Sequence, residues 1–133
     1  MSSEAKVPVG HEGDIVTARQ KGRELAMEVG FSGSDLTLIA TAISELARNI
    51  IVYAERGEIV LDVAHQNGRN GIVIIAHDEG PGIPNVEQAM QDGYSTGNSL
   101  GLGLPGAKRL MDEFNITSAV GKGTTITMKK WVP

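Results

Sequence analysis

The stretch Ile74-Ile75-Ala76-His77-Asp78-Glu79-Gly80-Pro81-Gly82 has the pattern of a buried strand that ends at an aspartate and runs into two glycines. A carboxylate is an acceptor-only group, and glycine backbone lets a flat ring approach closely. The stretch therefore favours binding of a flat ligand with an exocyclic amine, with Asp78, Gly80 and Gly82 as candidate contacts. A plain turn in which Asp78 caps the local backbone is the alternative. Binding is favoured because this turn joins no simple hairpin.

Two predicted hairpins and one short strand surround this stretch. The first hairpin consists of the β-branched runs Glu58–His65 and Ile72–Asp78, which we expect to be antiparallel neighbours. Between them stand Asn67-Gly68 and Asn70-Gly71, dipeptides that favour the left-handed backbone of hairpin turns. The remaining expected strands are Lys6–Val9, Ile116–Val120 and Thr124–Trp131, the last two joined through a Gly121-Lys122-Gly123 turn.

Helical spacing of apolar residues predicts the other elements. The first helix contains Ile15 to Val29 and is closed by Gly30. The second follows a capping candidate, Ser32 or Ser34, and runs through Asp35 to about Ala54. A short helix near Val86–Met90, a mobile polar loop at Asp92–Ser99 and a third long helix from about Leu102 to Phe114 follow. This order predicts a two-layer α/β sandwich, with the helices on one face of a mixed, mostly antiparallel sheet.

The second predicted helix carries a carboxylate and a carboxamide on one stripe, Glu45 and Asn49, four residues apart. The stripe lies roughly 100 to 130° from the apolar seam of that helix, so the pair flanks the core and does not point into bulk water. Such a pair can ligate a hard cation such as Mg²⁺, or supply one base and one ligand. A solvated helix face is the alternative, and for an isolated pair it is the commoner explanation.

A second glycine-rich stretch precedes the third long helix, with Gly101, Gly103 and Gly106 in a G-x-G-x-x-G pattern. A dinucleotide-binding fold would need a strand directly before these glycines, and the sequence has a polar loop there. A glycine loop that opens a helix presents free backbone N–H groups to phosphate oxygens. A glycine hinge without a ligand is the alternative. A Walker loop is absent, because Gly123 follows Lys122 where serine or threonine is required.

Composition excludes several other classes. The 133 residues predict one domain, residues 1–133. A net charge of −4 gives no basic footprint for nucleic acid. The chain has no cysteine, and its three histidines show no ligand spacing, so we expect no disulfide, zinc finger or thiol nucleophile. With no signal peptide or membrane span expected, the cytoplasm is the predicted location. Of the 17 glycines, nine lie between Gly80 and Gly123, so ligand contact or motion is expected there.

Four segments together resemble the boxes of the GHKL superfamily of ATP-binding domains, whose fold is the Bergerat type of α/β sandwich. They are Glu45-Leu46-Ala47-Arg48-Asn49, Asp78-Glu79-Gly80-Pro81-Gly82, Gly101-Leu102-Gly103-Leu104 and Gly121-Lys122-Gly123-Thr124-Thr125. The stretches around Asp14–Gln20, Ile43–Ile50 and Gly103–Phe114 are most similar to the serine/threonine switch kinases of the stressosome. The resemblance covers nearly the whole chain.

The resemblance implies residue roles around ATP and Mg²⁺. Asn49 would ligate magnesium, Glu45 would act as the general base, and Asp78 would bind the adenine amine with Gly82 beside it. Other cofactor-binding positions implied by the boxes are Gly80 and Ile83, Gly101, Leu102, Gly103 and Leu104 at the phosphates, and Thr124 or Thr125 near the base. A basic residue that assists transfer cannot be assigned, with Arg48 and Lys108 as candidates.

The same resemblance implies a partner-switching serine/threonine kinase. It would phosphorylate STAS-domain scaffold proteins, leave the scaffold and activate a PP2C-type phosphatase by binding to it. Two alternatives use the same nucleotide site. One is an anti-sigma factor that chiefly sequesters a sigma subunit, and the other is a simple ATPase in which Glu45 activates water.

Overall fold

The strand that ends at Asp78 lies at the centre of a five-stranded sheet in the part of the chain that the structure describes. The structure is a computed structural model, which describes residues 4–82, 90 and 103–133. The elements in chain order are β1 (Ala5–Val9), α1 (Glu12–Val29), α2 (Ser34–Ala54), β2 (Gly57–Gln66), β3 (Arg69–Asp78), α4 (Gly103–Leu110), β4 (Glu113–Ala119) and β5 (Gly123–Trp131). The strand order is β1-β2-β3-β5-β4, and every neighbouring pair is antiparallel.

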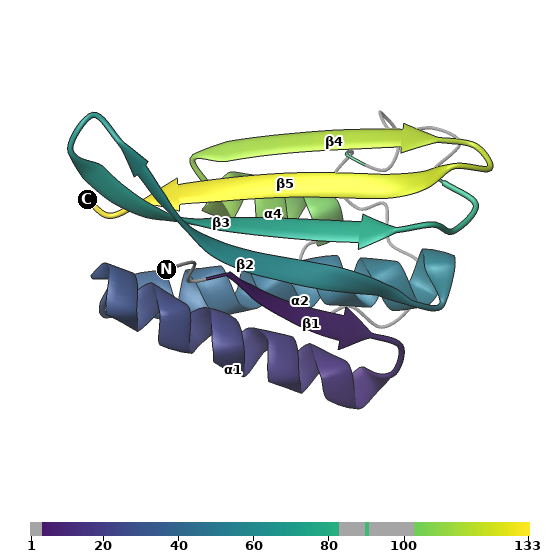
Figure 1. Cartoon of the computed structure of the whole chain (residues 1–133), viewed down its shortest axis with the longest axis horizontal. Helices are drawn as coiled ribbons and strands as arrows, with labels where there is room; N and C mark the ends of the chain where they lie inside the picture. Colours follow the sequence, from purple (N-terminus) through teal and green to yellow (C-terminus); the bar gives the residue numbers. More distant parts are fainter. Residues whose placement is uncertain (1–3, 83–89, 91–102) are drawn as a thin grey trace.

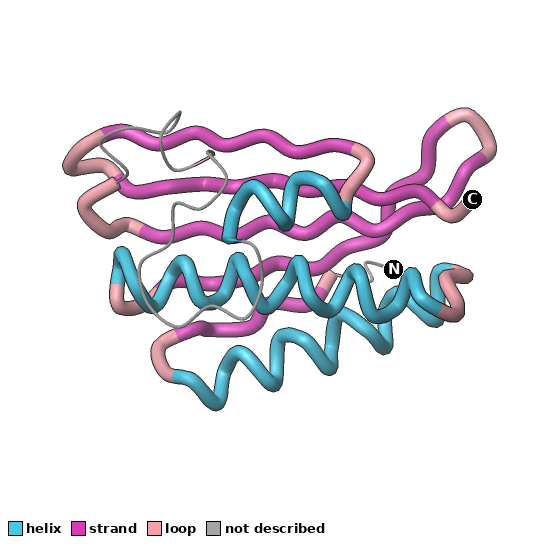
Figure 2. Tube along the Cα trace, turned by 180° about the vertical axis from the view of Figure 1, so that it is seen from behind, coloured by secondary structure: helices cyan, strands magenta, loops and turns pink. Residues whose placement is uncertain are grey.

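The helices cover one face of this sheet. Seen from behind, α2 and α4 lie in front of the strands and α1 lies alongside α2 (Figure 2), whereas the opposite view shows strands in front of α2 and α4 (Figure 1). The predicted two-layer α/β sandwich is therefore confirmed. The sheet is antiparallel between all described neighbours, where the sequence had predicted a mixed, mostly antiparallel one.

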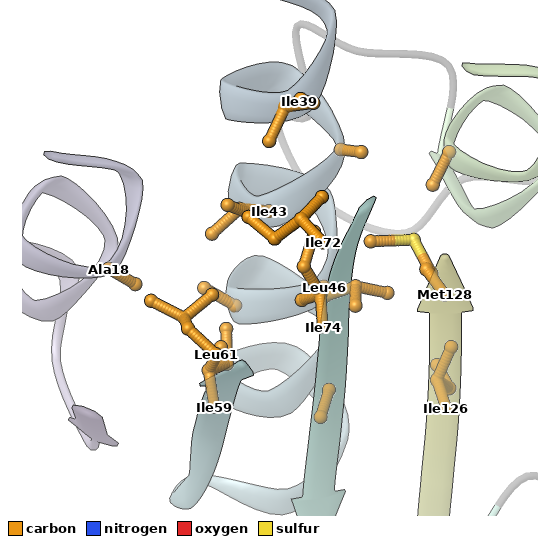
Figure 3. Packing of buried hydrophobic residues seen from close by; sticks show 14 of the residues in the cluster. Ala18, Ile39, Ile43, Leu46, Ile59, Leu61, Ile72, Ile74, Ile126 and Met128 are labelled. Carbon is orange, nitrogen blue, oxygen red and sulfur yellow. The ribbon is translucent and has the colours of Figure 1, made fainter. Parts of the chain in front are cut away.

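The core lies between the helices and the covered face of the sheet. Ile43 and Leu46 of α2 are fully buried and point toward Leu61 of β2 and Ile74 of β3, and Ile39, one turn earlier on the helix, is also fully buried (Figure 3). Each such side chain contributes about 1.5–3 kcal/mol when it leaves water. The two long helices approach closely at Gly22 of α1, because a Cβ at that position would lie only 2.1 Å from the Ile43 side chain.

The start of α1 is held by a carboxylate, and its end by a glycine. Asp14 accepts hydrogen bonds from the backbone N–H of Gly10 at 2.8 Å and of His11 at 3.2 Å. The Gly10 bond is the main reason that the pKa of Asp14 lies below its ordinary value. Gly30, at φ 122°, ends the helix and donates to the carbonyl of Ala26, as the sequence predicted.

The third long helix is shorter than predicted. The expected span reached Phe114, but α4 ends at Leu110 and Phe114 lies on β4. Strand pairing takes over at once, since the N–H of Asp112 donates to the carbonyl of Lys129 at 3.0 Å. Phe114 also pairs with the buried Met128, so partner contacts outweigh the helical spacing of this segment.

Two predicted local signals were wrong. The N-cap of α2 is Gly33, at φ 60° and without a side-chain cap, and neither Ser32 nor Ser34 takes that position. Of the two hairpin dipeptides only Asn67-Gly68 forms the turn, with φ values of 53° and 76°. Asn70 and Gly71 lie inside β3, paired with β2 across the sheet.

Two further expectations fall outside the described residues: the loop at Asp92–Ser99 and, apart from Met90, the short helix near Val86–Met90. By length and composition alone, α2 is able to cross a membrane, with a mean hydropathy of 1.3 over its most apolar window. In the fold, 56% of that window is buried inside the molecule and its apolar seam packs on the sheet, which is the behaviour of a core helix.

Candidate functional site

Asp78 and Thr124 face each other at one end of the sheet. They are direct partners in the β3–β5 pairing, so their side chains lie on the same face. This face is the helix-covered one, because Ala76 and Ile126, two residues away on each strand, are in the core. Both polar residues are 5% exposed, which makes them two of the few buried polar side chains among the described residues.

Hydrogen bonds within the chain hold both residues in place. Oδ1 of Asp78 accepts the backbone N–H of Gly80 at 2.9 Å. Oγ1 of Thr124 lies 2.9 Å from the hydroxyl of Ser118 on β4, which also donates to the Gly123 carbonyl at 3.2 Å. A carboxylate and a hydroxyl are thus presented side by side in fixed positions. Ser118 was missed in the sequence, because counting outward from the predicted Gly121-Lys122-Gly123 turn places Val120 opposite Thr124. The observed pairing of Ala119 with Gly123 brings Ser118 there instead.

Thr125 lies on the other face. Successive residues of a strand point to opposite sides, and Thr125 forms a hydrogen bond of 2.9 Å with Nδ1 of His77. The family resemblance implied that either Thr124 or Thr125 lies near the adenine base. The structure brings Thr124 beside Asp78, and it places Thr125 with His77 on the face without helices.

The glycines around Asp78 allow segments of this chain to approach one another. A Cβ on Gly80 would lie 2.5 Å from Cβ of Ala54 in the last turn of α2. A Cβ on Gly82, at φ 81°, would lie 2.3 Å from the Ala119 carbonyl of β4. Chain-to-chain packing therefore accounts for the missing side chains at both positions, whether or not a ligand is also near.

Glu45 and Asn49 are both buried on α2, 7% and 8% exposed. The prediction that the pair avoids bulk water is thus confirmed, and a solvated helix face is excluded. Leu46 and Ile50, which follow each of them in the chain, are in the core. Burial of a carboxylate and a carboxamide is costly unless each has polar partners, and Glu45 does have an interaction within the chain. Arg48, between them, is half-buried.

The helix α4 begins at Gly103, with φ 70°, and packs against α2. Leu104, at 6% exposure, anchors its first turn in the core, whereas Lys108 is exposed. The predicted site residues Ile83, Gly101 and Leu102 lie outside the described residues.

A pocket of about 680 Å³ opens at the same end of the sheet. It shares only Asp78 with the predicted site residues. Its lining residues are Pro8, Ala54, Arg56, Gly57, Glu58, His77, Asp78 and Glu79. Across residues 4–82, 90 and 103–133, no group of three or more His, Cys, Asp or Glu side chains is placed to hold a metal ion.

Comparison with known proteins gives one family model and a set of relatives. The model, described as a histidine kinase-like ATPase domain, matches residues 11–130. Serine/threonine-protein kinase RsbT of Bacillus subtilis (strain 168) is 51% identical over 132 residues, which are 99% of each chain. The Anti-sigma F factor of Geobacillus sp. (strain WCH70) is 34% identical over 105 residues, covering 74% of this chain and 70% of the relative. That of Caldanaerobacter subterraneus is 36% identical over 98 residues, covering 71% and 68%.

Proposed function

This chain belongs to the histidine kinase-like ATPase domain family and is a protein serine/threonine kinase that uses ATP; on that premise we propose that it phosphorylates a serine or threonine of STAS-domain scaffold proteins. After release from the scaffold it binds and activates a PP2C-type phosphatase. We further propose that residues 1–133 form a single kinase domain that acts in the cytoplasm. The fold supports one domain, because one core cluster takes in residues from β1 to β5.

The observation that carries the nucleotide assignment is the buried pair Asp78 and Thr124, opposite each other on the helix-covered face. We assign the adenine amine to the Asp78 carboxylate, because an acceptor-only group fits an exocyclic amine and does not fit a carbonyl. Thr124, and not Thr125, is assigned to the same end of the base. The Gly80 N–H bond to Oδ1 holds the carboxylate in that position.

Asn49 and Glu45 are assigned to magnesium and to proton transfer. The buried carboxamide oxygen of Asn49 fits a hard cation, and Mg²⁺ in kinases is usually held by one or two protein oxygens together with phosphate oxygens. Magnesium, when bound, neutralises charge that develops on the phosphates. We assign proton transfer to Glu45, one turn earlier on α2, because a carboxylate can take the proton of the substrate hydroxyl.

The first turn of α4 is assigned to the phosphates. Gly103 opens the helix in a left-handed conformation, and Leu104 fixes this turn in the core. Backbone N–H groups at a helix N-terminus suit anions. Ile83, Gly101 and Leu102 remain predicted contacts of the nucleotide.

An anti-sigma factor that sequesters a sigma subunit is the second candidate, favoured by the Anti-sigma F factor relatives at 34–36% identity. The kinase assignment is preferred because the relative named as a kinase is 51% identical over nearly the full length of both chains.

The assignment is tested by incubating the purified protein with labelled ATP, Mg²⁺ and a STAS-domain protein from the same genome. Label on a serine or threonine of the STAS protein is the expected result. Release of free phosphate without labelled protein would indicate an ATPase. Co-purification with a sigma subunit, without transfer, would indicate the sequestering function.

Glu45→Gln tests the proton acceptor in the same assay. Glutamine keeps the size and hydrogen-bonding capacity of the side chain but cannot accept the proton, so transfer should fall roughly 10²- to 10⁴-fold while ATP still binds. Glu28→Gln, an exposed change on α1, is the matched control and should transfer at the native rate. Native transfer by a folded Glu45→Gln variant would refute the base assignment. Activation of the phosphatase should persist in this variant, because that step needs binding and not transfer.

A further inference from the structure

The hydroxyl of Ser118 on β4 forms hydrogen bonds with Gly123 and Thr124, the first two residues of β5. It donates to the Gly123 carbonyl at 3.2 Å, and its oxygen lies 2.9 Å from Oγ1 of Thr124. Ser118 is the pairing partner of Thr124, and Thr124 is in turn the partner of Asp78. The three side chains therefore form one row across β4, β5 and β3 on the helix-covered face.

The Gly123 carbonyl, which can only accept, assigns a direction to the hydrogen bonds of this row. A hydroxyl carries one proton and two lone pairs. The Gly123 carbonyl can only accept, so the 3.2 Å bond assigns the Ser118 proton to it, and with that assignment the bond between Ser118 and Thr124 takes its proton from Thr124. In this arrangement the Thr124 oxygen faces any further partner as an acceptor, beside the acceptor carboxylate of Asp78.

We propose that Ser118 is a positioning residue that sets the base specificity of the nucleotide site by holding the Thr124 hydroxyl as an acceptor. The inference rests on the proposed function, in which Asp78 reads the base. Two adjacent acceptors match an exocyclic amine, which offers two N–H groups, and they oppose a carbonyl at the same place. Adenine and guanine differ in this way at one ring position. Ser118 thereby strengthens the preference for ATP over GTP without touching the nucleotide.

The test is equilibrium binding of ATP and of GTP, each with Mg²⁺, to folded Ser118→Ala protein. Without Ser118, the Thr124 hydroxyl rotates freely and can donate to a carbonyl. We expect ATP affinity to fall about 3- to 10-fold and the ATP-to-GTP preference to fall about 10-fold or more. Ser118→Thr keeps the hydroxyl and should restore the preference. Among the described residues, the Ser44 hydroxyl bonds within α2, to the Ala40 carbonyl at 2.9 Å, so Ser44→Ala should change neither affinity.

Asp78→Asn in the same assay separates this inference from the proposed function. If Asp78→Asn loses the preference and folded Ser118→Ala keeps it, the role of Ser118 is refuted and the adenine assignment stands. If Asp78→Asn also keeps the preference, the adenine assignment itself is wrong. Should Ser118→Ala not fold, Ser118→Cys replaces the hydroxyl by a weakly hydrogen-bonding thiol with little change in shape. A retained preference in Ser118→Cys would overturn the inference, and its loss would support it.

Discussion

The two hairpins of the sheet both turn through left-handed residues, yet their glycines serve different contacts. In the β2–β3 turn, Asn67 and Gly68 have positive φ, and a Cβ on Gly68 would meet no other atom within 4 Å. In the β4–β5 hairpin, Gly121 donates its N–H to the Pro81 carbonyl at 2.8 Å. A Cβ on Gly123, at φ 90°, would lie 2.1 Å from the backbone oxygen of Asp78.

The difference separates local turn chemistry from tertiary packing. The β2–β3 turn needs glycine only for its own backbone conformation. The β4–β5 turn needs it because the backbone of residues 78–82, which carries the candidate adenine contact, lies directly against it. The second hairpin thus packs against the candidate site, and the first only connects two strands.

The largest effect is expected from Gly123→Ala, which would force the β4–β5 turn away from Asp78. Strain at a left-handed position and overlap with a backbone oxygen should together lower the free energy of unfolding by about 2 to 5 kcal/mol. ATP affinity should fall with it, because Thr124 and Asp78 would separate. Chemical denaturation and nucleotide titration measure the two effects.

Gly121→Ala is the matched control within the same turn. Gly121 also has positive φ, 80°, but a Cβ there would meet nothing within 4 Å. Its cost should be about 1 kcal/mol, from conformation alone. Equal losses in the two variants would contradict the packing explanation for Gly123.

Asp78→Asn tests the candidate adenine contact that lies against the β4–β5 turn. An amide places a donor against the exocyclic amine, so ATP binding should weaken by about 1 to 3 kcal/mol while the fold is retained. Calorimetric titration with ATP and GTP provides the measurement. Binding of both nucleotides as in the native protein would remove Asp78 from the adenine site.

Gly68→Ala tests the β2–β3 turn, in which the glycine does not pack against another segment. Only the left-handed conformation opposes a Cβ there, so the free energy of unfolding should fall by about 1 kcal/mol. ATP affinity should stay at its native value, because the β2–β3 turn is at the opposite end of β3 from Asp78. A nucleotide-binding defect in this variant would show that the two hairpins are coupled.

The smallest effect on the free energy of unfolding is expected from Arg69→Ala, at the residue that follows the β2–β3 turn. The guanidinium lies 5.9 Å from the ring centre of Trp131, a cation–π contact at a partly exposed position. Its loss should cost about 0.5 to 1 kcal/mol. Trp131 is the single tryptophan, so its fluorescence reports the change directly. A larger loss than in Gly68→Ala would reverse the expected order.

The prediction of α1 and α2 from apolar spacing was confirmed, because burial on a sheet imposes a helical period that is visible along the chain. The same apolar spacing wrongly extended the third long helix to Phe114, which lies on β4. There the local pattern permits a helix, but pairing of β4 with β5 supplies contacts that no local window contains. Burial of Glu45 and Asn49 was also predictable, since their angle to the apolar seam follows from helix geometry alone.

Local chemistry in the sequence was sufficient for α1, for the body of α2 and for naming the candidate site residues, because propensity and periodicity act over a few residues. Contacts between distant segments were required to choose Thr124 over Thr125, to add Ser118 and to explain Gly80, Gly82 and Gly123. Strand register and backbone approach depend on which segments meet across the sheet. The local sequence around a residue does not specify which residue of another strand lies opposite it, because that depends on the register of strand pairing.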